Sequence, residues 1–220
     1  MKEIINDNKL LEGLRSRYAV KKFDSNIRLK KSKEILIKEI LQLTPTSFGL
    51  QLHKYLIVKD QKIREELKKY SWNQWQIVDS DFIIVFCVKD NFNINNIKEH
   101  TKNIQKVRWI DNEKRDGITA FMENEILIKR ELDPLKNIEN WQTRQAYIAL
   151  WNIMTSASLV WIDTCPIEWM DCKKYDEILW LKKLWLISKV VLAIGTRSID
   201  DKYQNEKKVR FPQSELFLEI

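Results

Sequence analysis

The sequence is poor in the residue types around which several common kinds of site are built. Its 220 residues include 4 glycines, 4 prolines, 3 cysteines and 2 histidines. Three cysteines without a CxxC pair argue against a disulfide scaffold and against a zinc site of Cys and His, and they favour a reducing cytoplasm. Neither histidine lies near a nucleophile elbow, and there is no GxGxxG or Walker loop. We therefore expect no catalytic triad, no metal site and no Rossmann or P-loop nucleotide site.

Long apolar runs are also missing. The longest candidate, Phe82–Val88, has the length of a strand, whereas a membrane-spanning helix needs about 18 apolar residues or more. The first residues, MKEIINDNKLLEGLR, carry acids and amides where a secretion signal has an apolar core. We therefore expect a soluble cytoplasmic protein with no membrane segment.

The net charge of +7 admits three explanations: a nucleic-acid partner, an anionic cofactor, or a lysine-rich source organism. The lysines are spread among acids along the whole chain, and no RNP-like or zinc-finger pattern is present. Nucleic-acid binding is therefore disfavoured, and the other two explanations remain open.

The pattern of apolar residues indicates one domain over residues 1–220, with an α+β fold. It predicts helices over about 10–17, 32–43, 61–69, 137–160 and 171–181, one or two more within 91–130, and strands over 54–58, 82–88 and 189–194. Because helices and strands alternate without the regular period of a doubly wound fold, we expect a mixed central sheet flanked by helices. The long helix 137–160 is apolar on most sides, so we expect it to be central and covered all round. Residues 215–220 alternate apolar and acidic, as in an edge strand that needs a partner.

Polar residues gather in three short segments at the predicted ends of elements. Alone, each segment is typical of a solvated surface. Together, they suit a phosphate-bearing cofactor, because arginine binds phosphate through two parallel hydrogen bonds and lysine acts as a point charge. The residues are Arg17, Ala19 and Lys21 in RYAVKKF, Thr46 and Ser47 in TPTS, and Lys208 and Arg210 in KKVRFP.

These segments also carry a resemblance to a known family. RYAVKKF, TPTSFGLQ, NQWQ at 73–76, CPIE at 165–168 and KKVRFP resemble, in order and spacing, the FMN-dependent nitroreductase family of the oxygen-insensitive NAD(P)H type. The match extends from about Leu10 to the C-terminus. Its most specific part is CPIE after a long helix that contains RQAYIAL.

The resemblance implies a nitroreductase-like fold in an intertwined homodimer. It places one FMN in each of two clefts at the subunit interface and makes NAD(P)H the electron donor. By position in the motifs, Arg17, Lys208 and Arg210 would hold the FMN phosphate. Lys21 and Asn73 would reach the pyrimidine edge of the flavin ring.

The same resemblance assigns the remaining site residues. Thr46 and Ser47 would come from the opposite subunit, and Pro166, Ile167 and Glu168 would line one face of the ring. Phe48 and Phe121 would wall the substrate pocket. The cofactor site is completed by four residues within the same motifs: Tyr18, Ala19, Gln76 and Trp169.

In this interpretation FMN supplies the hydride chemistry and accepts and donates two electrons through its N5 atom. Lys21 would tune the ring by placing positive charge where charge accumulates in the reduced flavin, so no catalytic side chain is needed. The expected acceptors are nitroaromatics, quinones or similar compounds. The alternatives are a flavin- or pterin-reducing enzyme of the same fold, a catalytically silent flavin-binding protein if Trp169 is genuine, and a basic nucleic-acid binder.

Tryptophan is as abundant as glycine is scarce: the chain has 9 Trp and 4 Gly. Average usage of about 7% would give roughly 15 glycines. Five tryptophans stand where glycine makes physical sense, namely Trp151, Trp161, Trp169, Trp180 and Trp185. One hypothesis is that the gene uses a code in which UGA means glycine; the other is a genuinely Trp-rich protein with a rebuilt site. Trp141, in the amphipathic stretch ENWQTRQ, is interpreted as genuine.

Overall fold

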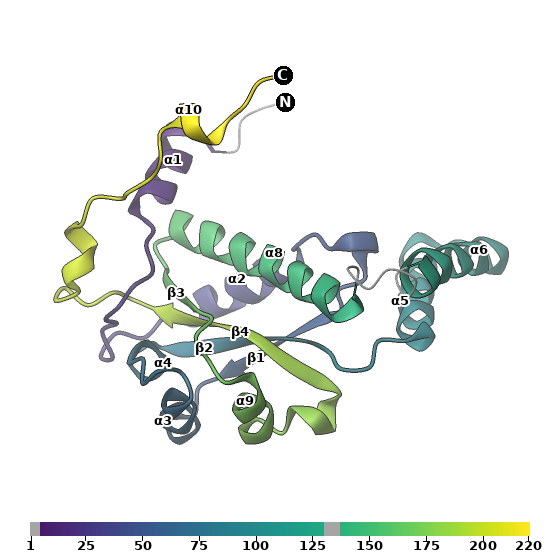
Figure 1. Ribbon diagram of the computed structural model, residues 1–220, viewed down its shortest axis with the longest axis horizontal. Coiled ribbons are helices and arrows are strands. Elements are labelled where there is room, and N and C mark those ends of the chain that lie inside the picture. Colours follow the sequence, from purple (N-terminus) through teal and green to yellow (C-terminus); the bar gives the residue numbers. More distant parts are fainter. Residues whose placement is uncertain (1–4, 130–136) are drawn as a thin grey trace.

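A four-stranded antiparallel sheet forms the centre of the molecule. The computed structural model describes residues 5–129 and 137–220 (Figure 1). The strands are β1 (His53–Val58), β2 (Phe82–Lys89), β3 (Asp163–Ile167) and β4 (Leu186–Gly195), in the order β1-β2-β4-β3. All three pairings are antiparallel, so the prediction of a mixed sheet is wrong for the described residues. Each strand runs opposite to the neighbour with which it pairs, and β3 is followed by α9 and η4 before the chain returns in β4.

The helices predicted with bounds match the structure closely, with α3 agreeing at both ends, whereas α4 and α10 were not predicted. They are α1 (Asp7–Ser16), α2 (Lys31–Gln42), α3 (Gln61–Lys69), α4 (Gln76–Asp79), α5 (Ile94–Arg108), α6 (Asn112–Glu123), α8 (Ile138–Leu159), α9 (Cys172–Ile178) and α10 (Gln213–Leu216). Short 3-10 turns are η1 (Ser47–Gly49), η4 (Leu181–Leu184) and η5 (Lys202–Asn205), and a π-helical turn, η2 (Asn124–Ile128), follows α6. Within the predicted stretch 91–130, the last residue lies outside the described residues. Strand β3 is an element that sequence reasoning missed.

Both faces of the sheet are covered, which explains why β2 is apolar without interruption. Ile83, Val85 and Cys87 point into the cluster formed with α3, α4 and α9. Ile84 and Phe86, at the alternate positions, point into the cluster under α8 and α2. In Figure 1, α8 and α2 lie on one side of the sheet and α3, α4 and α9 on the other. A strand buried on both faces reads as a continuous hydrophobic run rather than as an alternation.

Helix α8 lies across one face of the sheet, as the prediction of a central helix requires. Its sheet side is buried through residues such as Ala146, Leu150 and Ile153. Its opposite side carries Ile148 and Trp151, which are about half exposed. The expectation that α8 is covered all round is therefore wrong within one chain, and an apolar strip of this helix faces outward.

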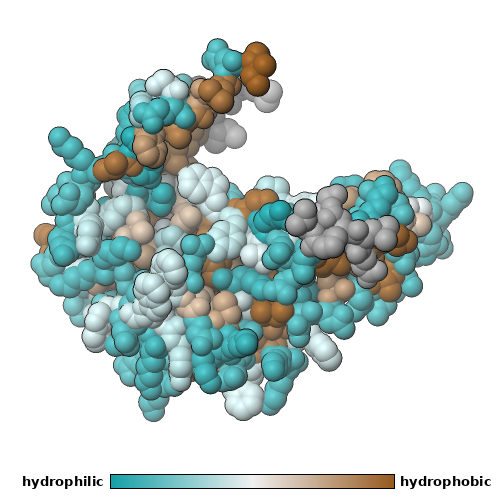
Figure 2. Space-filling model, in the orientation of Figure 1, coloured by the Kyte–Doolittle hydropathy of each residue, from teal (hydrophilic) through white to brown (hydrophobic). Residues whose placement is uncertain are grey.

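The N-terminal helix and the C-terminal segment project from the same side of the body (Figure 1), and Nζ of Lys208 joins them by donating to the carbonyl of Leu14. Gly13 of α1 packs on the end of α8 so closely that a Cβ atom there would stand 2.6 Å from Cδ2 of Leu159. Residues 217–220 form no strand, and α10 precedes them, so the predicted edge strand over 215–220 is not formed in this chain. Residues 211–220 are all exposed, so this segment packs against no sheet edge of its own chain. Figure 2 shows apolar side chains on this arm and a hollow between it and the body.

Among the described residues, no helix combines the length and apolarity that crossing a membrane requires.

Candidate functional site

The segment after α1 crosses the ends of two strands. Its residues are extended at Arg17, with φ −69° and ψ 130°. The backbone N–H of Val20 donates to the carbonyl of Thr164 at 3.2 Å, and that of Asp24 donates to the carbonyl of Thr196 at 2.9 Å. These bonds fix RYAVKKF against β3 and against the loop that follows β4.

A cavity of about 650 Å³ opens beside this segment, within the range of small-molecule pockets. Of the fourteen residues predicted to bind the cofactor, seven line it: Arg17, Tyr18, Ala19, Lys21, Pro166, Lys208 and Arg210. They come from the start of the chain, from β3 and from the C-terminal segment. The other wall residues include Met154 of α8 and Tyr203 and Gln204 of η5, which sequence reasoning missed.

Three of the cations that line the cavity, Arg17, Lys208 and Arg210, influence one another, and none of them forms an ion pair within the described residues, although Glu206 also lines the cavity. Burial and then the nearby charge of Arg210 lower the pKa of Arg17. Burial, Arg17 and Arg210 lower the pKa of Lys208 in the same way. Among residues 5–129 and 137–220, no salt bridge joins any of the three to a carboxylate. Like charges that crowd together in a cavity are suited to an anion such as a phosphate, so these residues fit the phosphate of FMN.

Lys208 has a second contact that orders the cluster. Its Nζ donates to the carbonyl of Leu14 at 2.9 Å and also to the carbonyl of Arg17. A cation at the C-terminal end of a helix satisfies free carbonyl groups and interacts favourably with the helix dipole. Lys208 thus ties the C-terminal segment to α1 at the cavity.

Asp201 holds the RYAVKKF segment and was not singled out from the sequence. This buried carboxylate accepts from the backbone N–H of Lys21 at 2.8 Å and of Lys22 at 3.1 Å, and from the hydroxyl of Tyr18 at 3.1 Å. It also accepts from the N–H of Tyr203 at 3.0 Å. Burial alone would raise the pKa of Asp201, but these hydrogen bonds outweigh it and hold the pKa below its usual value. Its place before a 3-10 turn, as an N-cap, was the available sequence signal.

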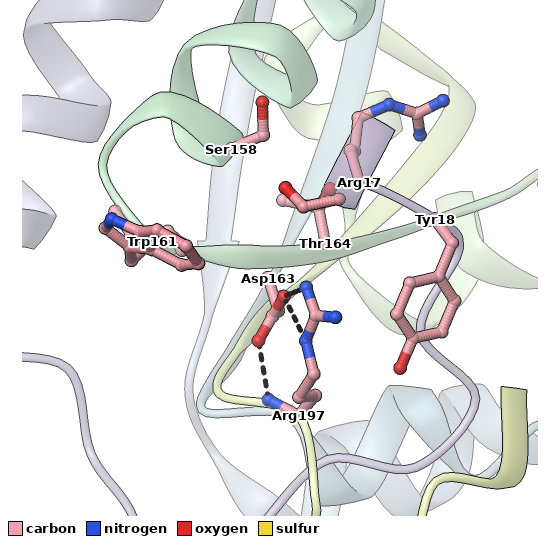
Figure 3. A pocket seen from close by; sticks show the side chains of 9 residues that line it. Arg17, Tyr18, Ser158, Trp161, Asp163, Thr164 and Arg197 are labelled. Atoms are coloured by element: carbon pink, nitrogen blue, oxygen red, sulfur yellow. Dashed lines mark hydrogen bonds and ion pairs between the residues drawn. The ribbon is translucent and has the colours of Figure 1, made fainter. Parts of the chain in front are cut away.

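Arg197 is a further cavity residue that sequence reasoning missed. Its Nε donates to Oδ1 of Asp163 at 2.8 Å, and its backbone N–H donates to Oδ2 at 2.8 Å. Figure 3 shows this pair below Thr164, with the Tyr18 ring to one side. The Cζ atom of Arg197 lies 4.7 Å from the centroid of the Tyr18 ring. Since its charge is already matched by Asp163, Arg197 shapes the wall rather than adding a free cation.

Lys21 lies near the start of the CPIE segment. Burial raises the pKa of the Cys165 thiol to about 11, and the positive charge of Lys21 acts against that rise. Pro166 lines the cavity, whereas Ile167 is buried in the core and Oε1 of Glu168 accepts from the Tyr147 hydroxyl at 2.5 Å. Of this segment, the structure therefore brings only Pro166 to the cavity wall.

The other predicted residues lie in two groups away from the cavity wall. Asn73 has a left-handed backbone, Gln76 is buried at the start of α4, and the indole of Trp169 stacks on that of Trp72 with ring centroids 4.5 Å apart. Trp169 is thus held by Trp72 and does not line the cavity in this chain.

The second group surrounds η1. The backbone N–H of Ser47 donates to Oε1 of Gln145 at 2.7 Å, while Oγ1 of Thr46 accepts from the N–H of Gln51 at 3.1 Å. Phe48 and Phe121 form an edge contact with centroids 6.2 Å apart. Gln145 and the cavity residue Met154 are separated along α8 by roughly 14 Å at the helical rise. The group is therefore not part of the cavity in the same chain.

The fold and site define a class of protein with an antiparallel sheet between helical layers and a cavity lined by cations at the strand ends. The sequence profile described as the nitroreductase family matches residues 14–196, so the chain belongs to this family. A candidate NAD(P)H nitroreductase of Staphylococcus epidermidis is 33% identical over 177 residues, which are 77% of each chain. YfkO of Bacillus subtilis, also a candidate NAD(P)H nitroreductase, is 32% identical over 178 residues, 77% of this chain and 76% of its own.

Solved structures share the fold. A candidate nitroreductase of Exiguobacterium sibiricum, solved in complex with FMN, superposes with a TM-score of 0.81 over 100% of both chains at 18% identity. The nitroreductase-like α+β fold predicted from the motifs is thus confirmed, with an antiparallel sheet.

Replacing Asp201 tests how this segment is held. We expect Asp201→Asn to lower the free energy of unfolding by about 1–3 kcal/mol at pH 7, because an amide presents N–H groups to donors. A carboxylate with a depressed pKa stabilises the fold above its unfolded pKa, and this contribution is lost as pH falls through the folded pKa. The difference between wild type and variant in urea denaturation should therefore shrink below about pH 4.

Asp200→Asn is the matched control, since Asp200 is exposed and only pairs with Lys22 on the surface. It should change stability by less than about 0.5 kcal/mol. Equal effects of the two substitutions would contradict the role given to Asp201.

Proposed function

We propose that the protein is an FMN-dependent NAD(P)H oxidoreductase that reduces nitroaromatic, quinone or similar acceptors by two electrons. The observation that carries this proposal is the convergence of Arg17, Lys208 and Arg210 on one cavity without a paired carboxylate. The names of the relatives as candidate NAD(P)H nitroreductases, and the FMN bound by the structural neighbour from Exiguobacterium, support it.

The three cations would hold the phosphate of FMN, and the ring would extend toward Ala19, Lys21 and Pro166 along the same wall. When bound, FMN supplies the hydride chemistry that no side chain provides. Lys21 contributes positive charge beside the wall, and such charge stabilises the electron-rich reduced ring. Its backbone N–H is fixed by Asp201, so the start of its side chain is held in place.

The chain's own acidic and nucleophilic groups fit this division of labour. Burial keeps Cys165 protonated, since it raises the pKa of the thiol to about 11. Burial and then Glu168 raise the pKa of Tyr147. Neither group is ionised near neutral pH, so neither acts as a nucleophile or base there, and hydride transfer requires none.

We also propose a homodimer in which a second copy completes each site. The outward strip of α8 and the arm beyond Arg210 expose apolar side chains that include Trp151, Phe211, Phe217 and Leu218. Monomeric proteins rarely leave apolar patches of this kind uncovered. Thr46 and Ser47 lie near Gln145, which is far along α8 from the cavity of their own chain. A second copy on the outward strip would bring them to the partner's cavity.

Two other functions stay within the same fold. A flavin- or pterin-reducing enzyme would use the same cavity with another acceptor. A catalytically silent flavin-binding protein is favoured if the Trp169 indole stands over the ring in the dimer.

The phosphate role of the cations predicts a loss of affinity. Arg210→Ala should weaken the binding of FMN to the apoprotein by about 10–100-fold, because one charge-assisted contact is removed. Titration of flavin fluorescence measures the dissociation constant. Arg28→Ala is the control, since Arg28 pairs with Asp81 and does not line the cavity. The assignment fails if both variants bind FMN equally well.

The activity itself is tested by spectroscopy under anaerobic conditions. The purified protein should be yellow, should bleach when NADH or NADPH is added, and should recover its colour with 4-nitrobenzoate or benzoquinone. Lys21→Gln should bleach about 100-fold more slowly, as expected for a lost electrostatic contact to the reacting group. A yellow colour that no reductant bleaches would favour the silent binder, and a colourless protein that takes up no added FMN would refute the proposal.

A further inference from the structure

Tryptophan accounts for most of the unusual backbone conformations in the described chain. The non-glycine residues with positive φ are Phe48, Gln51, Trp72, Asn73, Trp109, Trp161, Trp180 and Trp185. Only a few per cent of non-glycine residues adopt such values, and bulky ones are genuine outliers. Of the glycines, by contrast, Gly49 alone has a positive φ. Most of the positions whose positive φ favours glycine are thus occupied by tryptophan, the bulkiest residue.

Four of these tryptophans stand where helices end. Trp109 is the C-cap of α5, and Trp185 is the C-cap of η4. Trp161 follows Val160, the C-cap of α8, and Trp180 follows Leu179, the C-cap of α9. Their φ values are 53°, 54°, 58° and 55° in that order. A left-handed residue at the end of a helix is usually glycine, because only glycine avoids the steric penalty of a Cβ there.

The hydrogen bonds at two of these helix ends are those of the Schellman motif, in which glycine usually takes the left-handed position. The N–H of Ile162 donates back to the carbonyl of Ala157 at 2.9 Å, across Trp161. The N–H of Trp180 donates to the carbonyl of Glu177 at 3.2 Å. These are bonds of the Schellman motif, whose left-handed position Trp161 and Trp180 occupy.

The four indoles, of Trp109, Trp161, Trp180 and Trp185, are not buried, so packing does not offset the strain of their backbone conformation. Their exposed fractions range from 64% at Trp185 to 91% at Trp109, and Figure 3 shows Trp161 at the rim of a small pocket. Trp141, in contrast, has a right-handed helical backbone, is 5% exposed and lies in the cluster with Leu50 and Ile97. Large aromatic side chains normally contribute through such burial.

The other tryptophans give a weaker case. Trp72 shares its left-handed turn with Asn73, and its ring stacks on Trp169. Trp151 and Trp169 do not have a positive φ, so the backbone conformation does not favour glycine at either position. The hypothesis drawn from the sequence for Trp151 and Trp169 stays a hypothesis.

We propose that the natural protein carries glycine at positions 109, 161, 180 and 185, because its gene is read with UGA as glycine. This extends the idea to Trp109, which composition did not single out, and rests it on backbone geometry. The proposal does not depend on the function proposed above.

The codons and the masses of the corresponding peptides test it directly. The gene should have UGA at Trp109, Trp161, Trp180 and Trp185 and UGG at Trp141. Peptides of the protein isolated from its source organism should have the mass of glycine at the four positions and of tryptophan at Trp141. A UGG codon at any of the four, or a tryptophan mass there, overturns the proposal.

Thermal unfolding of the recombinant protein with the printed sequence provides a second, independent test. Trp161→Gly and Trp180→Gly should each raise the midpoint of thermal unfolding by about 2–4 °C, because each removes a Cβ atom that is strained in the left-handed backbone conformation. Trp161→Ala and Trp180→Ala keep the Cβ and are the matched controls, with a smaller rise or none. Trp141→Gly should lower the midpoint, because it leaves a cavity. If the alanine variants gain as much as the glycine variants, the backbone argument is wrong.

Discussion

The carboxylate of Asp201 is the contact on which the proposed site depends. It accepts from the backbone of Lys21 and Lys22 and from the Tyr18 hydroxyl. A buried carboxylate with this many donors has its hydrogen-bonding capacity satisfied, so it holds the segment from Tyr18 to Lys22 in place. Without it, the RYAVKKF segment would have fewer bonds to the chain between β4 and η5, and Arg17 and Lys21 would not be held toward one cavity. Lys208 makes the second tie, from the C-terminal segment to α1.

The sheet and the cations place different demands on the sequence. The sheet is stabilised by apolar burial on both faces, which local patterns reveal, as in the run FIIVFCV of β2. The cation cluster draws together residues from the two ends of the chain, whose mutual repulsion is unfavourable unless an anion offsets it. A site of this kind is stable when its ligand is bound, and the ligand in turn stabilises the fold.

Prediction from sequence succeeded where a local pattern is sufficient. The spacing of apolar residues located α3 and α8, and the motifs indicated the family and the fold that the comparisons then confirmed. It failed for β3, because DTCPI is short and contains a proline. It also failed for the direction of strand pairing and for Asp201 and Arg197, since their partners are distant in the chain. The roles assigned to Thr46, Ser47, Phe48 and Phe121 stay predictions, because their group lies away from the cavity of its own chain.

The tryptophans show how composition and conformation inform each other. Scarce glycine first suggested that some tryptophans occupy glycine positions, and the left-handed ends of α5, α8 and α9 then identified positions where the backbone requires it. Exposure separates them from Trp141, whose indole fills a core.

The central claim is that the cavity recognises a phosphate, and comparing two flavins tests it most directly. FMN and riboflavin share the isoalloxazine ring and differ in the phosphate. Titration of the apoprotein with each should show FMN binding at least about 100-fold more tightly, because several charge-assisted contacts are made only by the phosphate. Equal dissociation constants for the two flavins would contradict the account.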